Sequence, residues 1–380
     1  HSDPRPVAAG FSRDTNLLDG SHHADSADSA FTFEGNWQDF ARIALPNLLL
    51  TIVTLGIYRF WATARERRYL WSRTRFVDEH LEWAGTGMEL FAGFVIVLVL
   101  FGVPYFGVSF VSQALIARGY EALGSALGVA ALLSIFYLGG VARFRALRYR
   151  LSRTRWRGIR GGSDSKGFAF GLSYMWKTAV GWLPLGLLLP WSMTSLWNER
   201  WSKMSFGPFA FRSDGEAGGV FARFLLFYLA PFVLFVGGVI MAGMGMLAGY
   251  GIGGENGVAL GGLVGLIGLV LFFYLGLGLI AVAFYAKFYR EMVGATRWRD
   301  LRFSFEASTL DWVKLLLGDA LLVVFTLGIG LVFLSYRHWK FFMTHLEASG
   351  EILLDELTQS RTRTAGHGEG LLDAFDMGAI

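Results

Sequence analysis

The sequence FTF at residues 31–33, followed by TLG at 54–56 and RERRY at 65–69, decides the fold because the same pattern returns near the other end of the chain. The second copy reads FSF at 303–305, TLG at 326–328 and RHWKF at 337–341. In both copies, 21 positions separate the last aromatic residue of the first motif from the threonine. Internal repeats define an architecture more strongly than local motifs do. We therefore predict a chain built from repeated units.

A weaker middle copy has FAF at 168–170 and NERW at 198–201. Here Pro190-Trp191-Ser192 stands where the other copies have Thr-Leu-Gly. Aromatic or apolar pairs that alternate with other residues also occur at 81–83 and 209–211. Alternation with a period of two is typical of strands. We expect these segments to pair in small cytoplasmic β elements.

Apolar composition indicates a membrane protein. The chain has 380 residues, of which 53% are apolar and 17% charged. Such a composition is too apolar for an ordinary soluble protein, and several segments approach the roughly 20 residues that a spanning helix needs. Four segments are predicted to be full spans, at residues 88–111, 122–141, 220–247 and 258–286, and three interrupted ones lie at 37–61, 176–197 and 310–336.

Arginine clusters follow the first, third and sixth apolar segments, whereas the loops at 112–121 and 251–257 contain only Arg118 as a basic residue. Short loops rich in Arg and Lys stay in the cytoplasm. This rule places both ends of each interrupted segment on the cytoplasmic side. A helix that crosses the membrane once cannot begin and end on the same side.

Each interrupted segment contains a helix breaker, namely Pro46, Pro184 or Gly318, 13 or 14 positions after the preceding aromatic pair. Proline and glycine weaken or end a helix, and broken helices occur at membrane depth where protein or water covers the backbone. We predict that these three segments are re-entrant. Kinked crossings, which would give seven spans, are the alternative.

These observations predict an all-α polytopic membrane protein with two full repeats and one partial repeat of three apolar segments. The expected divisions are a disordered tail at 1–30, repeats at 31–160, 161–302 and 303–350, and a C-terminal tail at 351–380. The polar first 30 residues do not resemble a signal peptide. The absence of cysteine excludes disulfides and thiolate metal sites.

Polar residues inside apolar segments are candidate functional groups because they are costly in a membrane. Asn47 and Asp319 lie beside the breakers Pro46 and Gly318, and Lys177 follows a repeat tryptophan. One hypothesis is a polar site where broken helices meet, as in transporters. In the alternative interpretation, Asn47 and Asp319 cap helices and the lysine extends towards the headgroups.

Basic residues next to the apolar segments are predicted to bind anionic lipid headgroups rather than nucleic acid. The candidate residues are Arg65, Arg67, Arg68, Arg153, Arg155, Arg157, Arg297 and Arg299. A second set has the spacing of small residues that allows helices to approach closely, within the chain or in a homo-oligomer. This set consists of Gly245, Gly249, Gly257, Gly261 and Gly265.

Catalytic signatures are absent from the sequence, so we expect neither an enzyme nor a cofactor. Asp78-Glu79-His80 with Glu82 has the composition of a metal cluster, but a solvated turn explains it more simply. His338 and His345 share a helix face and lack a third ligand in the sequence, so we predict no metal site.

The stretch LTIVTLGIYRFW at 50–61, with RRYLW at 67–71 and GTG at 85–87, resembles the YjgN-like family of bacterial inner-membrane proteins, which carry a domain of unknown function. The resemblance covers about residues 31–350. It implies location in the inner membrane and helical character, and no activity. It also makes a membrane-associated metallopeptidase a candidate partner.

Two functions remain open from the sequence. The first is a transporter or channel, suggested by repeats, broken helices and glycine-rich spans. The second is a non-catalytic scaffold that binds anionic lipid or a partner protein. Proton-coupled transporters usually have several carboxylates within the membrane, and only Asp319 qualifies here.

Overall fold

The structure is a computed structural model that describes residues 8–11, 29–183, 185–353 and 357–362. The chain forms two compact units. Unit 1 comprises residues 1–215, 293–306 and 319–380, and unit 2 comprises residues 216–292 and 307–318. The described residues are mostly helical. The principal helices are α1 (Trp37–Val53), α2 (Arg59–Ser72), α3 (Gly87–Val97), α4 (Val103–Ala117), α5 (Glu121–Arg153), α6 (Phe168–Trp182), α7 (Leu189–Ser202), α8 (Gly218–Gly294), α9 (Thr309–Phe325) and α10 (Leu334–His345).

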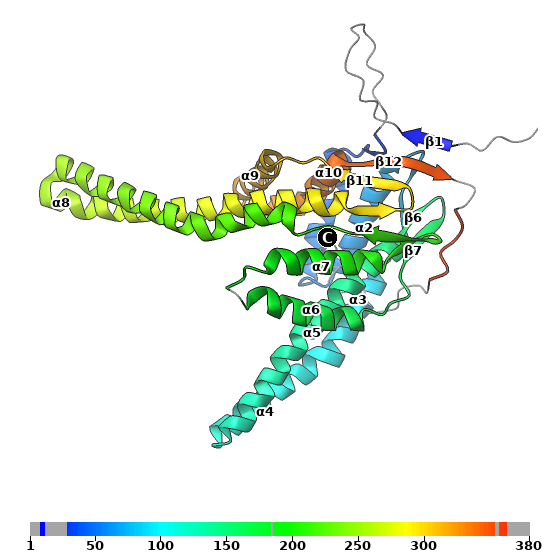
Figure 1. Ribbon diagram of the computed structural model, residues 1–380, viewed down its shortest axis with the longest axis horizontal. Helices are drawn as coiled ribbons and strands as arrows, with labels where there is room; N and C mark the ends of the chain where they lie inside the picture. Colours follow the sequence, from blue (N-terminus) through cyan, green and yellow to red (C-terminus); the bar gives the residue numbers. More distant parts are fainter. Residues whose placement is uncertain (1–7, 12–28, 184, 354–356, 363–380) are drawn as a thin grey trace, which may run out of the picture. The chain divides into compact units, whose positions relative to one another are not determined.

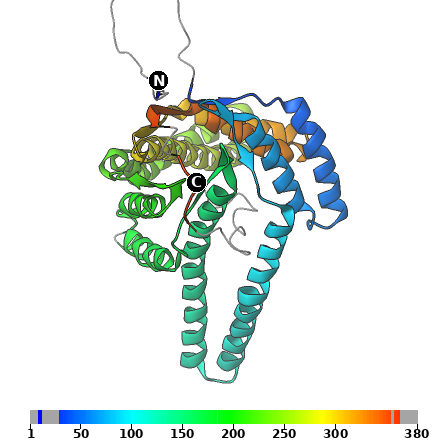
Figure 2. The ribbon, with the colours of Figure 1, turned by 90° about the vertical axis from the view of Figure 1, so that its right-hand side faces the viewer.

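Three helical segments in the described residues are long and apolar enough to cross a membrane. They are α5 and the two halves of α8, Gly218–Glu255 and Gly257–Gly294, which meet at a kink where Gly253 and Gly254 leave helical geometry. The remaining predicted span, at 88–111, lies in α3, the π-helical turn η1 (Leu98–Gly102) and α4, which follow one another without a break. Figure 2 shows α4 and α5 as one long hairpin, and Ser112 Oγ donates to the carbonyl of Gly124 at 2.7 Å near its end.

Antiparallel strands of unit 1 form the second layer of structure. Three strands pair in the order β2-β3-β4, and nine pair in the order β1-β12-β11-β10-β9-β8-β7-β6-β5. This layer is larger than the small β elements that we predicted. Its strands are β1 (Ala8–Phe11), β2 (Phe31–Phe33), β3 (Thr74–Phe76), β4 (Glu79–His80), β5 (Glu82–Trp83), β6 (Thr154–Trp156), β7 (Ile159–Gly162), β8 (Ser205–Phe206), β9 (Phe209–Ser213), β10 (Thr296–Trp298), β11 (Leu301–Phe305) and β12 (Leu346–Leu353).

Four strand pairs are hairpins with two-residue turns, and each follows directly on a helix. The first turn residue has a positive φ in every case: Val77, Arg157, Gly207 and Arg299. Turns of this kind match the right-handed twist of paired strands. The helix-to-hairpin order explains why basic motifs such as Thr154-Arg155-Trp156 stand immediately after the long helices.

Aromatic side chains from both sheets share one buried core. Phe76 of β3, Trp156 of β6, Phe211 of β9 and Trp298 of β10 belong to this cluster. The two sheets also approach each other at β2 and β12, since Ser29 Oγ, two residues before β2, donates to Glu347 Oε1 of β12 at 2.6 Å. Strands from both sheets therefore contribute to this cluster, and a second buried cluster contains Phe40, Trp71 and Trp83.

Three tryptophan–threonine hydrogen bonds join successive parts of unit 1. Each indole N–H donates to the first residue of a hairpin strand: Trp71 to Thr154 at 2.9 Å, Trp197 to Thr296 at 3.2 Å, and Trp339 to Thr74 at 2.8 Å. The third bond links α10, near the C-terminal end of the described residues, back to the first strand hairpin, β3–β4.

Two local predictions were wrong. Phe168-Ala169-Phe170 is the first turn of α6 rather than a strand, and the preceding strand is β7. The segment at 1–30 is not unstructured throughout, because Ala8–Phe11 pairs with the end of β12. The rest of that predicted tail up to residue 28, and the C-terminal residues after 362, lie outside the described residues.

Candidate functional site: three helical hairpins

Three helical hairpins correspond to the interrupted segments and constitute the candidate site. The first is α1 and α2, the second is α6 and α7, and the third is α9 with the 3₁₀ turn η2 (Ile329–Phe333) and α10. Helix α1 packs along α2, and α6 packs along α7 (Figure 1). Strands or strand-bearing loops join both ends of the first two hairpins, so their tips lie at the end away from the sheet.

A Leu–Gly turn forms the tip of each hairpin. The leucine and glycine both have positive φ: 52° and 93° at Leu55-Gly56, 54° and 82° at Leu185-Gly186, and 50° and 92° at Leu327-Gly328. In the first and third hairpins the glycine N–H donates to the carbonyl five residues earlier. This bond is a common way to satisfy the free carbonyls at a helix end. The turn therefore ends the first arm of each hairpin.

The threonine of the TLG motif connects the two arms. Thr54 Oγ1 donates to the carbonyl of Leu50 at 2.7 Å and accepts from the N–H of Tyr58 at 2.9 Å. Thr326 makes the same two contacts with Leu322 and Gly330, both at 2.6 Å. One hydroxyl thus satisfies a carbonyl at the end of the first arm and an N–H at the start of the second.

The breaks predicted at Pro46 and Gly318 were wrong in position. Pro46 lies inside α1 and Gly318 inside α9, and both helices continue to the Leu–Gly turn. Pro184 lies outside the described residues. The middle counterpart of Leu55-Gly56 is Leu185-Gly186 rather than Trp191-Ser192, so the middle copy is closer to the other two than its sequence suggested.

Apolar side chains cover the three tips and face outward. Leu55 is 93% exposed, Leu185 is 85% exposed and Leu327 is 94% exposed. Val53, Leu183 and Phe325 beside them are also largely exposed. A leucine with positive φ is strained where glycine would not be. The three tips thus retain a large apolar side chain at a position that favours glycine.

The three predicted polar residues occupy the same place in the three hairpins. Asn47, Lys177 and Asp319 each lie eight positions before the leucine of their tip. Each is mostly buried and contacts the second arm of its own hairpin. No hydrogen bond or ion pair between described residues joins one of the three to another.

Their partners differ. Lys177 Nζ forms an ion pair with Glu199 Oε2 at 2.7 Å, and Lys203 contacts the other oxygen of Glu199 at 2.9 Å. Burial would raise the pKa of the Glu199 carboxyl, but hydrogen bonds from the two lysines outweigh burial and lower this pKa. The second hairpin is therefore held together by a lysine–glutamate–lysine cluster.

In the third hairpin, the Asp319 carboxylate accepts from Arg337 Nε at 2.5 Å and contacts His338 Nε2 at 2.6 Å. In the first hairpin, Asn47 Nδ2 makes only a long contact of 3.5 Å to the carbonyl of Ala62, and its buried Oδ1 has no donor among the described residues. The first hairpin alone therefore has an unsatisfied polar group at this position among the described residues.

The predicted lipid-binding arginines fall into two groups. Several are engaged within the protein: Arg67 is buried over the ring of Trp83, Arg153 pairs with Glu89 at 2.9 Å, and Arg157 pairs with Asp78 at 2.5 Å. Weaker contacts hold Arg297 to Asp214 at 3.5 Å and Arg299 to Asp300 at 3.4 Å.

Arg65, Arg68 and Arg155 are exposed. Arg155 pairs in register with Arg160 across the β6–β7 hairpin. Burial lowers the pKa of Arg160, and the charges of Arg153, Arg155 and Arg148 lower it further. Like charges on paired strands are destabilising without counter-ions, so this part of the sheet is suited to anions.

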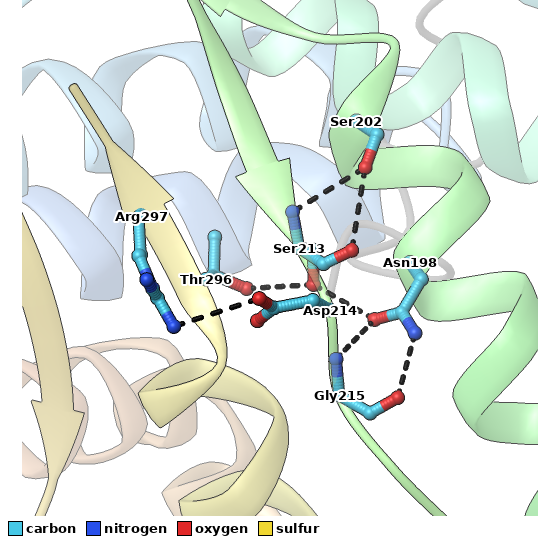
Figure 3. Close-up of polar contacts among 7 residues, drawn as sticks. All are labelled: Asn198, Ser202, Ser213, Asp214, Gly215, Thr296 and Arg297. Carbon is cyan, nitrogen blue, oxygen red and sulfur yellow. Dashed lines mark hydrogen bonds and ion pairs between the residues drawn. The ribbon is translucent and has the colours of Figure 1, made fainter.

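A polar network fixes the chain just before α8 (Figure 3). The side chain of Asn198 forms two hydrogen bonds with the backbone of Gly215, at 2.8 and 3.0 Å, and accepts from Ser213 Oγ at 2.9 Å. Ser213 also contacts Thr296 of β10 at 3.2 Å. These hydrogen bonds anchor the loop at residues 213–215 to α7 and β10.

The five predicted packing glycines lie where the two halves of α8 meet. A Cβ on Gly249 would lie 2.2 Å from the carbonyl oxygen of Gly257, and a Cβ on Gly261 would lie 2.2 Å from that of Gly245. Gly265 packs in the same way against Ala242. Only glycine permits these backbones to approach so closely.

The residues considered for a metal site have other partners. Asp78 and Glu79 contact Arg157, and His80 Nε2 contacts Glu34 at 3.3 Å. His338 contacts Asp319. In the part of the chain that the structure describes, no group of three His, Asp or Glu side chains is arranged to hold a metal ion.

Sequence reasoning missed the residues that organise the hairpins. Two of the tryptophan–threonine bonds join distant residues of one predicted repeat and the third joins the third repeat to the first, and no local pattern indicates which tryptophan meets which threonine.

Long apolar helices, three hairpins with exposed apolar tips and a basic sheet define a multi-pass membrane protein. The family described as "Bacterial protein of unknown function (DUF898)" matches residues 28–374, and the chain belongs to this family. No solved structure matches the chain.

Relatives named inner membrane protein YjgN share part of the sequence. The protein from Salmonella typhimurium strain LT2 is 31% identical over 103 residues, which cover 27% of this chain and 24% of that protein. The protein from Escherichia coli O157:H7 is 28% identical over 136 residues, which cover 36% of this chain and 31% of that protein. The chain thus matches no more than a third of these relatives' length. Together with the apolar helices, these relatives identify a multi-pass protein of the bacterial inner membrane.

Proposed function

We propose that this protein is a non-catalytic membrane scaffold that binds anionic phospholipid at the cytoplasmic face of the inner membrane. The observation that carries the proposal is the set of three Leu–Gly tips whose leucines are 85–94% exposed. A large apolar side chain on a strained, exposed turn is stabilised where acyl chains cover it. The hairpins would enter the cytoplasmic leaflet and return, as re-entrant segments in a threefold repeat.

Charge supports the same orientation. Arg65 and Arg68 lie on the second arm of the first hairpin, at the end that leads into β3, and basic strands follow. Basic residues at the cytoplasmic surface are attracted to anionic lipid by about 1 kcal/mol each. The α4–α5 turn and the kink of α8 would then face the periplasm.

The transporter hypothesis requires the polar residues of the hairpins to form a common site. Lys177 and Asp319 have ion-pair partners within their own hairpins, and no described hydrogen bond or ion pair connects them. This arrangement favours the scaffold. A flux assay comparing wild type with Asp319→Asn would detect the alternative, because transport that responds to this substitution would contradict the scaffold.

The tips are tested with single cysteines in the cysteine-free chain. Leu55→Cys, Leu185→Cys and Leu327→Cys would carry an environment-sensitive fluorophore in reconstituted vesicles. We expect strong quenching by lipids brominated on their acyl chains, whereas Asp300→Cys on a strand turn should be quenched little. Equal quenching at the tips and at residue 300 would exclude insertion.

Lipid preference is tested by quantifying the phospholipids that remain bound after purification in mild detergent. We expect the retained lipid to be enriched in phosphatidylglycerol and cardiolipin relative to the source membrane. Retained lipid with the composition of that membrane would contradict the proposed function.

A further inference from the structure

A pocket of about 390 Å³ lies between the two arms of the first hairpin. Its lining includes the arginines Arg42, Arg65 and Arg68, with Asn47 and Ser72, and no acidic residue. The volume is within the usual range of small-molecule sites. Three guanidinium groups around one pocket create an excess of positive charge.

The arginines of this pocket are poorly neutralised. Arg42 has Asp39 at 3.6 Å, one turn away on the same exposed helix face. Arg65 lies 5.6 Å from the ring of Tyr58. Within the described residues, neither Arg65 nor Arg68 has a carboxylate within ion-pairing distance. An anion would therefore be attracted without displacing an internal partner of Arg65 or Arg68.

Comparison with the third hairpin shows that the first hairpin lacks the carboxylate that pairs with the equivalent arginine. Arg65 and Arg337 each lie ten positions after the leucine of their tip, and Asn47 and Asp319 each lie eight positions before it. In the third hairpin, the Asp319 carboxylate neutralises Arg337. In the first hairpin, the neutral amide of Asn47 occupies the position of that carboxylate, so Arg65 has no ion-pair partner at this position.

Asn47 provides an independent indication of a ligand. The residue is 2% exposed, yet its Oδ1 has no hydrogen-bond donor among the described residues. A buried acceptor without a donor loses its hydrogen bond to water and gains none in return, which is unfavourable. A ligand with an oxyanion for the arginines and a hydroxyl or ammonium donor for Asn47 would satisfy both requirements.

The depth of the pocket fits a headgroup. At 1.5 Å per residue, Asn47 lies about 12 Å and Arg42 about 20 Å along the hairpin from Leu55. One leaflet contributes about 15 Å of hydrocarbon. If the Leu55 tip enters the acyl chains, the pocket therefore lies at the level of the phosphates.

We propose that this pocket binds one phosphate-bearing headgroup, with the phosphate on Arg65 and Arg68 and a hydroxyl or ammonium group on Asn47. This assignment deepens the proposed function and rests on it for the source of the ligand. Arginine binds phosphate oxygens through paired hydrogen bonds. The same chemistry would accept a soluble phosphate ester, and the experiment separates the two sources.

The test measures thermal unfolding of the full chain in non-ionic detergent, titrated with phosphatidylglycerol, phosphatidylcholine, glycerol 3-phosphate or inorganic phosphate. Asn47→Asp introduces the carboxylate of the third hairpin, and Arg68→Gln removes a charge. The matched control is Lys340→Gln, since Lys340 is the third-hairpin counterpart of Arg68.

We expect phosphatidylglycerol to raise the unfolding midpoint of wild type and Lys340→Gln, and its apparent affinity to fall at least tenfold in Asn47→Asp and Arg68→Gln. A response to glycerol 3-phosphate or inorganic phosphate that equals the lipid response would assign the site to a soluble ester.

Unchanged lipid affinity in both pocket variants would overturn the pocket and leave the proposed function standing, provided that purified wild type is enriched in anionic lipid. Absence of that enrichment would instead contradict the proposed function, whatever the pocket variants do. If Asn47→Asp fails to fold, Arg68→Gln against Lys340→Gln decides the result alone.

Discussion

At the scale of residues, three different polar side chains occupy the same position in the three helical hairpins. Eight positions before each tip, the chain places an amide, an ammonium or a carboxylate, each directed at the second arm. Lys177 and Asp319 form ion pairs with charged partners. Asn47 is uncharged, and its Oδ1 has no hydrogen-bond donor among the described residues. The same geometry therefore serves as an internal clamp in two hairpins and leaves a binding position in the first.

The lysine–glutamate–lysine cluster of the second hairpin should make stability depend on pH. Because the pKa of Glu199 is lowered in the folded protein, its contribution is present above the unfolded carboxyl pKa of about 4.3 and is lost as the pH falls through the folded value. Glu199→Gln should destabilise the protein by about 1–2 kcal/mol at pH 7. Thermal unfolding between pH 7 and pH 3 should show this difference shrinking below about pH 5. A difference that stays constant across this range would contradict the assignment.

At the scale of elements, glycine has two different uses. Gly56, Gly186 and Gly328 permit the positive φ at which each first arm ends. In α8, by contrast, glycines with helical geometry let two long apolar helices touch through their backbones. The first use depends on conformation and the second on the absence of a side chain.

Substitutions in α8 should separate these effects. Gly249→Ala introduces a Cβ 2.2 Å from a backbone oxygen, whereas Gly243→Ala meets nothing within 4 Å. We expect Gly249→Ala to lower the thermal midpoint in detergent by several degrees, in keeping with the roughly 1–3 kcal/mol of an overpacked contact. Gly243→Ala should leave the midpoint unchanged or raise it slightly, because alanine favours helix. Equal effects of the two substitutions would show that the helices are not in contact there.

The sequence predicted the apolar helices well and the hairpin breaks poorly. Length and hydrophobicity alone identify α5 and both halves of α8. Pro46 was given too much weight, because a proline can be retained within a helix that neighbouring structure supports. The Leu–Gly turns are part of the TLG motif that the sequence repeats. They were not predicted as turns, because leucine is rare at positive φ and because the middle copy lacks the threonine.

The candidate site was predictable only in part. Asn47, Lys177 and Asp319 were recognised as polar residues within apolar segments, but their partners were not, because ion pairs across a hairpin depend on where the chain turns. The role of Arg67 was misjudged for a similar reason: composition places it in a basic cluster, while the fold buries it over Trp83.

At the scale of the whole molecule, strands β5 to β12 pair in the order of the chain, and helices connect the successive strand hairpins. The basic residues accumulate on and next to the strands, and the long apolar helices carry few charges. This separation of charge along each helix–strand unit is the pattern expected when one side of every unit stays in the cytoplasm.

Orientation can be measured with a membrane-impermeant maleimide on spheroplasts. Glu121→Cys at the α4–α5 turn and Glu255→Cys at the kink of α8 should react from outside. Asp300→Cys on the β10–β11 turn should react only after the membrane is permeabilised. Reaction of residue 300 in intact spheroplasts would reverse the proposed topology.

The tryptophan–threonine bond between α10 and the first strand hairpin has a consequence for biosynthesis. Thr74 precedes its partner Trp339 by 265 residues, and Ser29 precedes its partner Glu347 by 318 residues. The first hairpin therefore cannot complete these contacts until α10 and β12 have been synthesised. A polypeptide that ends before α10 leaves Thr74 and Ser29 without these partners. We therefore expect such a truncated product to be cleaved by proteases more readily than the full chain.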